Sequence, residues 1–294
     1  MSAVPRLTRR RALLLLLAVA VPVLGFLGSA WWEQSKRGGQ LPAEPFRIAG
    51  TFHYVGANDV ASFLVTGPAG HVLIDGGFPG TAPMIMASIA KLGFDIRDVK
   101  VLLNSEPHFD HAGGLAELQR ASGAELWASE ASAEAMVAGG YDRRLPFPMR
   151  LVSWAIRYPA PRVDHRLRDG DTIRVGPTAI TAHLTPGHTR GCTSYSLPVR
   201  DGERALLVVS ACSLVTLQGA QYPGQREDFE RTFAVLRSLP ADVWVTSHAR
   251  LFGRYRKFLA RDSAANPADP FIDREGYRAY VDSGEARIRR GVVH

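Results

Sequence analysis

The chain has 294 residues, of which 46% are hydrophobic and 21% are charged. This length permits one large domain or two small ones, and the composition excludes an intrinsically disordered chain. The formal net charge of +7 comes mostly from scattered arginines, with no basic run interleaved with aromatic residues. We therefore expect a solvated basic surface and no nucleic-acid partner.

The N-terminus predicts export. Four arginines between positions 6 and 11 precede an apolar run over 12–27, and small residues follow at 28–30. This layout is typical of a cleaved secretory signal over residues 1–30, and the pair Arg9-Arg10 also permits twin-arginine export. The alternative is an uncleaved membrane anchor, although the run is slightly short for a full span. We expect a periplasmic or secreted protein that meets a membrane only through an uncleaved signal.

A polar link over 31–44 is predicted to follow, and then a single domain over 45–294 that includes a C-terminal helix. In chain order, the pattern predicts strands at 46–55, 62–66 and 71–74, a helix at 81–92, a strand at 99–104 and a helix at 114–121. It then predicts a strand at 125–128, a helix at 130–138, two strands between 169 and 184, a hairpin over 195–209, a helix at 226–239 and a strand at 243–246. Paired strands with helices inserted between them indicate two sheets that are covered by helices on both outer faces.

The segment Glu106-Pro-His108-Phe-Asp110-His111 follows the predicted strand at 99–104. Four potential metal ligands within six residues cannot all point one way on a helix or a strand, whereas a loop at a strand end can turn them toward one point. Zinc favours imidazole and carboxylate ligands, and its catalytic sites leave a position for water. Two such sites that share one loop indicate a dinuclear centre, with metals about 3.5–4 Å apart.

Two further histidines also lie at strand ends. His188 lies in the turn Thr185-Pro-Gly-His-Thr-Arg-Gly191, and His248 follows the strand predicted at 243–246. Taken alone, each histidine has an ordinary explanation as a hydrogen-bonded turn residue. Beside the cluster at 106–111, each becomes a candidate metal ligand.

Together with Asp75 in Leu73-Ile-Asp-Gly-Gly77, these residues resemble the metallo-β-lactamase superfamily. The segments His108-Phe-Asp-His-Ala-Gly-Gly114 and Thr185-Pro-Gly-His-Thr-Arg-Gly-Cys-Thr193 look like the third subclass of class B β-lactamases. The resemblance covers about residues 46 to 280. It implies an α/β fold, a four-layer αββα sandwich, and an enzyme that acts on a small-molecule β-lactam. We expect a monomer, but the sequence itself does not determine the oligomeric state.

The resemblance also implies a role for each residue of the set. Two zinc ions would be held, the first by Glu106, His108 and His188, and the second by Asp110, His111 and His248. Asp75 would brace the metal loop through hydrogen bonds, because ligands need outer partners to stay oriented. A metal-bound hydroxide would open the β-lactam ring of an antibiotic, with Asp110 as the catalytic residue that orients it.

The chain departs from this pattern at Glu106, which stands where the family usually has its first histidine. A carboxylate adds a negative charge to the first zinc site and lacks the fixed ring geometry of histidine. Pro107 restricts the backbone of Glu106 to extended conformations. We therefore expect a first site that is looser, and more dependent on added zinc, than the second.

Relatives often place serines that meet the substrate carboxylate near Ser210-Ala-Cys-Ser213, and Ser213 is the candidate here. The two cysteines, Cys192 and Cys212, are predicted to form a disulfide because the two strand ends that carry them are expected to be adjacent. The alternative is two buried free thiols.

Two other functions remain open. A lactonase or thioester hydrolase of the same fold usually carries an aspartate that bridges both metals, between the positions of His188 and His248. The corresponding strand end here, at 210–213, has no acidic residue. The third possibility is a non-catalytic metal-binding protein, and the intact set of six ligands disfavours it.

Overall fold

The computed structural model describes residues 39–292 except 142, 144, 146, 148 and 218, together with the isolated residues 10 and 25. Gln40–His294 forms one compact unit, and Met1–Gly39 is divided from it. The signal predicted over 1–30 thus falls outside the described residues at all but two positions. In the described part of the chain, no helix has both the length and the apolar character needed to cross a membrane.

The first sheet has seven strands in the order β1-β2-β3-β4-β5-β6-β7. Its strands are β1 Phe46–Ala49, β2 Phe52–Tyr54, β3 Phe63–Val65, β4 His71–Ile74, β5 Val99–Leu103, β6 Glu125–Ser129 and β7 His165–Leu167. Strands β1 to β4 pair antiparallel, and β4 to β7 pair parallel. The carboxyl ends of β4, β5 and β6 therefore share one edge of the sheet.

The second sheet has five strands in the order β12-β11-β10-β9-β8. Its strands are β8 Thr172–Val175, β9 Thr178–Leu184, β10 Thr193–Asp201, β11 Arg204–Ala211 and β12 Val243–Thr246. All pairs are antiparallel except β11 with β12, which is parallel. The carboxyl ends of β11 and β12 therefore also share an edge.

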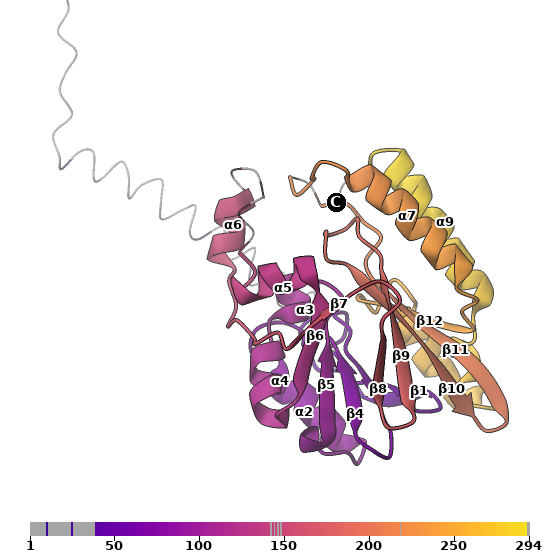
Figure 1. Cartoon of the computed structure of the whole chain (residues 1–294). Helices are drawn as coiled ribbons and strands as arrows, with labels where there is room; N and C mark the ends of the chain where they lie inside the picture. Colours follow the sequence, from indigo (N-terminus) through magenta and orange to yellow (C-terminus); the bar gives the residue numbers. More distant parts are fainter. Residues whose placement is uncertain are drawn as a thin grey trace, which may run out of the picture. The chain divides into compact units, whose positions relative to one another are not determined.

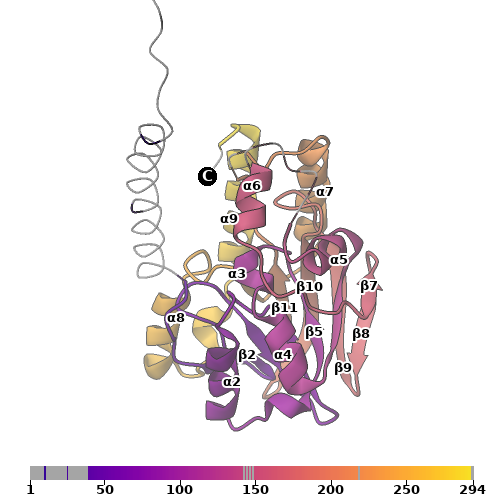
Figure 2. The same cartoon turned by 90° about the vertical axis from the view of Figure 1, so that its left-hand side faces the viewer.

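Helices cover the outer face of each sheet. Figure 2 shows α2 Ala82–Lys91, α4 Leu115–Ser122 and α5 Glu130–Val137 on the first sheet. Figure 1 shows α7 Gln225–Ser238 and α9 Arg274–Arg289 side by side on the second. The remaining helical segments are α3 Phe109–Ala112, α6 Met149–Ala155, α8 Arg254–Ala260 and the 3₁₀ turns η1 Ile96–Asp98, η2 Arg261–Ser263 and η3 Asp269–Phe271. The predicted αββα sandwich of two sheets between helical layers is confirmed.

The period-two pattern of the strands divides the core into two layers. In β3, Phe63 and Val65 belong to the cluster that both sheets share, whereas Leu64 packs with the helix residues Ile85 and Leu118. Successive side chains of a strand point to opposite faces, so a sheet with apolar residues at every position must be covered on both sides.

Several predicted elements need correction. The strand expected over 46–55 is a hairpin of two short strands, because Gly50 takes φ +50° and a side chain there would meet the carbonyl oxygen of Arg200. The metal motif, expected in a loop, ends in the short helix α3. Three further elements, α6, β7 and α8, were not predicted, because they are short and lack a clear apolar period.

Cys192 and Cys212 form a disulfide, as predicted. The bridge links the residue before β10 to the residue after β11. The two cysteines are 20 positions apart in the sequence. Replacing both cysteines by alanine should lower the free energy of unfolding by about 3 kcal/mol, because the unfolded chain regains loop freedom. Chemical denaturation of metal-free protein measures this change. Reductant should lower the free energy of unfolding of the parent protein by the same amount and should not change that of the double variant. Equal denaturation midpoints for all samples would contradict the prediction.

Candidate metal centre

The metal motif is held in place by its own backbone and by two neighbouring side chains. Asn104 Nδ2 donates to the carbonyl oxygen of Glu106 at 2.7 Å, and the Tyr158 hydroxyl donates to the carbonyl oxygen of Pro107 at 2.6 Å. His108 has an extended backbone and stands directly before α3, whose first turn carries Asp110 and His111. The change from extended chain to helix lets four side chains of one short segment face the same region, where they belong to two adjacent ligand groups.

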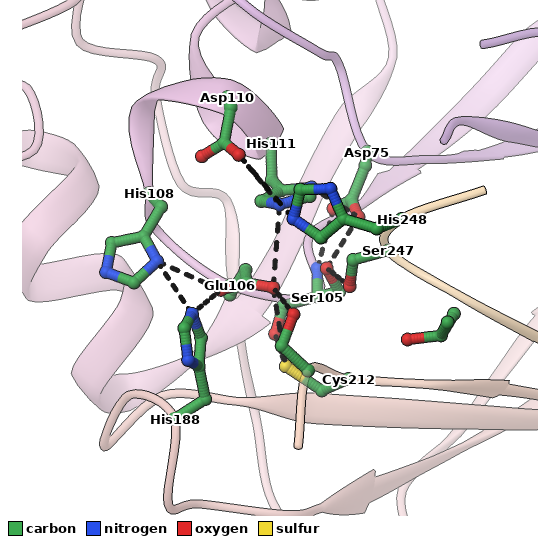
Figure 3. Close-up of polar contacts among 12 residues, drawn as sticks. Asp75, Ser105, Glu106, His108, Asp110, His111, His188, Cys212, Ser247 and His248 are labelled. Atoms are coloured by element: carbon green, nitrogen blue, oxygen red, sulfur yellow. Dashed lines mark hydrogen bonds and ion pairs between the residues drawn. The ribbon is translucent and has the colours of Figure 1, made fainter. Parts of the chain in front are cut away.

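The first group of candidate ligands is Glu106, His108 and His188. Glu106 Oε2 lies 2.7 Å from His188 Nε2 and 3.0 Å from His108 Nδ1, and the two ring nitrogens are 3.1 Å apart. Glu106 comes from the segment after β5 and His188 from the turn between β9 and β10 (Figure 3). The two sheets thus bring these three donor atoms together.

The second group is Asp110, His111 and His248. Asp110 Oδ2 lies 3.3 Å from His111 Nε2 and 3.8 Å from His248 Nε2. The two imidazole rings meet edge to face, with centroids 5.1 Å apart. His111 Nε2 also lies 3.6 Å from Glu106 Oε1, so the two groups are adjacent.

The outer nitrogens of two histidines have partners that set their tautomers. His188 Nδ1 donates to the carbonyl oxygen of Val215 at 2.7 Å, and His248 Nδ1 lies 3.2 Å from Asp59 Oδ2. Since these nitrogens carry the protons, the Nε2 atoms keep lone pairs that face the site. Such outer hydrogen bonds are typical of metal-binding histidines.

This donor set fits a cation. His188 Nε2 and Glu106 Oε2 are both acceptors, and two acceptors 2.7 Å apart repel each other unless a proton or metal ion lies between them. When a proton occupies this position, the His188 ring is positively charged. Burial acts to raise the pKa of Glu106, but the charges of protonated His188 and His111 then outweigh it and hold the pKa of Glu106 well below its usual range. Burial acts to lower the pKa of His111, yet Asp110 and Glu106 raise it to about 10. A buried cluster of carboxylates and imidazoles with this preference for positive charge is suited to zinc.

Asp75 lies beneath the metal loop, directly after β4. Its carboxylate accepts from the Ser105 amide at 2.8 Å and from the Ser105 hydroxyl at 2.5 Å, and Oδ2 is 3.8 Å from His111 Nδ1. Burial raises the pKa of Asp75 to about 6, against the opposing effect of His111. Asp75 has a backbone φ of +63°, and its hydrogen bonds tie it to Ser105, the residue directly before Glu106.

Asp59 is a site residue that the sequence analysis missed. Besides facing His248, its carboxylate accepts from the Arg250 amide at 3.0 Å and pairs with the Arg250 guanidinium. Asp59 and His248 are 189 residues apart in the sequence. A lone aspartate between Asn58 and Val60 carries no pattern from which this contact could have been found.

Ser213 and the disulfide complete the wall behind Glu106. The Ser213 hydroxyl donates to Glu106 Oε1 at 2.7 Å, and Cys212 Sγ lies 3.9 Å from the same oxygen. Cys192, Cys212 and Glu106 also place their donor atoms within 4.8 Å of one another. Because the sulfurs are bonded to each other, they are not thiolate ligands, and they pack against the carboxylate instead.

A sequence profile of the metallo-β-lactamase superfamily matches residues 55–202. The chain belongs to this superfamily. Rm3 metallo-β-lactamase is 39% identical, with a TM-score of 0.79, over 85% of this chain and 94% of that chain. BJP-1, a subclass B3 metallo-β-lactamase of Bradyrhizobium japonicum, is 31% identical, with a TM-score of 0.80, over 88% of this chain and 97% of that chain.

Curated superfamily members with similar sequences carry a different name. Hydroxyacylglutathione hydrolase of Jannaschia sp. (strain CCS1) is 26% identical over 190 residues, which are 64% of this chain and 61% of that protein. The chain thus matches about three fifths of the length of such relatives. Membership in the superfamily supports a hydrolase, and the fold implies a bound metal, usually zinc.

Proposed function

We propose that the protein is an exported β-lactamase that holds two zinc ions. The first ion would be bound by Glu106, His108 and His188. The second ion would be bound by Asp110, His111 and His248. When bound, zinc polarises a carbonyl oxygen and lowers the pKa of water to about 7, so that a nucleophile is available without a protein side chain. A small-molecule β-lactam as substrate, a monomeric chain and a periplasmic or secreted location belong to this proposal.

The observation that carries the proposal is the chemistry at the end of β11. A lactonase or thioester hydrolase of this fold usually has an aspartate there that bridges both metals. Here Cys212 is bonded to Cys192, and Ser213 donates its hydroxyl to Glu106. No carboxylate among the described residues 210–213 is available to bridge the two groups.

The β-lactamase structures also support the proposal, since BJP-1 and Rm3 match this chain over nearly their whole length and at higher identity than the curated hydrolases. The names of those hydrolases favour one second candidate, hydrolysis of a glutathione thioester. Thioester cleavage needs the same metal chemistry, so the substrate must be tested directly.

In the proposed reaction, Asp110 orients the attacking water. Its side chain is 19% exposed, so the carboxylate reaches solvent while Oδ2 faces His111 and His248. Asp75 holds the motif from behind through Ser105, and Asp59 fixes the ring of His248. These residues position the reacting groups, because a loop alone would leave the ligands free to turn.

The purified protein should hydrolyse nitrocefin, and EDTA should abolish the reaction until zinc is restored. Absorbance of the opened ring measures the rate. A hydroxyacylglutathione is the parallel substrate, assayed at the same enzyme and zinc concentrations. Rapid thioester cleavage with no turnover of any penicillin, cephalosporin or carbapenem would refute the β-lactamase proposal, and zinc-independent turnover would refute the metal mechanism.

A further inference from the structure

The two oxygens of the Glu106 carboxylate have different surroundings. Oε2 faces the donor nitrogens of His108 and His188, whereas Oε1 accepts the hydrogen bond of Ser213. Both Glu106 and Ser213 are buried, with 0% and 2% of their surfaces exposed. Oε1 also lies 3.6 Å from His111 Nε2 and 3.9 Å from the bonded sulfur of Cys212.

We propose that Ser213 is a positioning residue that fixes which oxygen of Glu106 serves the first metal. This inference rests on the proposed metal centre and adds a function for Ser213 within it. A carboxylate can bind through one oxygen or two, and it can rotate about its terminal bond. The Ser213 hydrogen bond holds Oε1 away from the first group, so that Oε2 is presented to it as a single oxygen ligand.

Without the Ser213 hydroxyl, Oε1 would be a buried oxygen that lacks its hydrogen-bond donor. Such an unsatisfied acceptor is destabilising, because it has lost its hydrogen bonds to water and gained none in the protein. His111 Nε2, which lies 3.6 Å from Oε1, belongs to the second group. The carboxylate would then be drawn toward the second group and away from His108 and His188. Ser213 thus compensates for the geometric freedom that a glutamate has and a histidine lacks.

The backbone of Ser213 is itself fixed. Its neighbour Cys212 is bonded to Cys192, and the Cys212 amide donates to the Ser194 hydroxyl at 3.0 Å. The next residue, Leu214, is buried against Gly284 of α9. A donor at the end of such a rigid segment can hold the carboxylate in one orientation.

This role conflicts with the expectation that Ser213 meets a substrate carboxylate. A serine hydroxyl has one proton to donate, and Glu106 Oε1 already accepts it at 2.7 Å. A substrate carboxylate would have to displace Glu106 from that hydrogen bond. We therefore place Ser213 behind the metal ligand and not in contact with the substrate.

Competition of the purified protein with a chromophoric chelator tests this inference, since it measures zinc binding without an activity assay. Ser213→Ala should weaken the more weakly bound zinc by about tenfold or more, a size typical of lost outer hydrogen bonds. The tighter zinc should change less than twofold. Ser213→Thr keeps the hydroxyl and should restore binding, and Ser88→Ala, a buried serine of α2, is the matched control.

The decisive comparison repeats Ser213→Ala in a Glu106→His background, where no carboxylate remains to be positioned. We expect little effect of the serine there. An equal loss in both backgrounds, or no loss in the parent, would overturn the inference, as would a raised KM with zinc binding unchanged. Thermal unfolding of the metal-free variants verifies that they are folded. If the protein binds zinc as expected but does not cleave β-lactams, the proposed substrate is wrong and the role of Ser213 stands.

Discussion

Replacing Asp110 by asparagine should lower kcat for nitrocefin by about 10²- to 10⁴-fold, the range that a positioned acid or base contributes. Asparagine keeps the shape of the side chain but removes its negative charge and replaces one carboxylate oxygen by an amide nitrogen. Because Asp110 Oδ2 is the atom that faces both His111 and His248, we also expect weaker binding of the second zinc. Steady-state kinetics at saturating zinc, together with the zinc content of the variant, measure the two effects.

The control for Asp110 is Asp262→Asn, which alters an exposed aspartate of the turn η2 and should leave both quantities unchanged. Added zinc separates the two roles of Asp110. If saturating zinc restores the rate of Asp110→Asn to within tenfold of the parent, the carboxylate acts only as a ligand and does not orient the attacking water.

Replacing Glu106 by histidine should strengthen the first zinc site by about tenfold or more and move the rise of activity to lower pH. The carboxylate adds negative charge beside that of Asp110, and extra donor charge weakens the pull of the metal on water. Histidine is neutral, and its ring geometry is fixed without help from Ser213, whereas the orientation of the glutamate depends on one hydrogen bond, so the variant should need less added zinc. We expect the activity of the parent, in contrast, to rise with zinc concentration and with pH above neutral.

The opposing hypothesis is that the negative charge of Glu106 strengthens zinc binding, so that the parent is fully loaded as isolated. The Ser213 hydrogen bond would add to this by holding the carboxylate still. Zinc titration and pH profiles of the parent and Glu106→His, measured side by side, separate the two hypotheses. Equal zinc affinity and the same pH optimum in both proteins would show that our account of Glu106 is wrong.

The sequence predicted the order of the main elements well, because apolar periodicity and glycine-terminated helices are local signals. The helix predicted at 81–92 is found as Ala82–Lys91, and the strand predicted at 243–246 has those bounds. The prediction failed where local signals are weak: a glycine turn divides the strand expected over 46–55, and the seven-residue helix α6 was not anticipated.

The sequence by itself determined the candidate ligands, because four of the six lie within residues 106–111 and the other two follow predicted strands. Only the tertiary structure decided how the remaining atoms around the ligands are arranged. Asp59 meets His248 across 189 residues, and Ser213 meets Glu106 across 107. The physical reason is that spacing along a chain reports which residues share a local element, whereas such contacts depend on how strand ends from two sheets align when the sheets pack together.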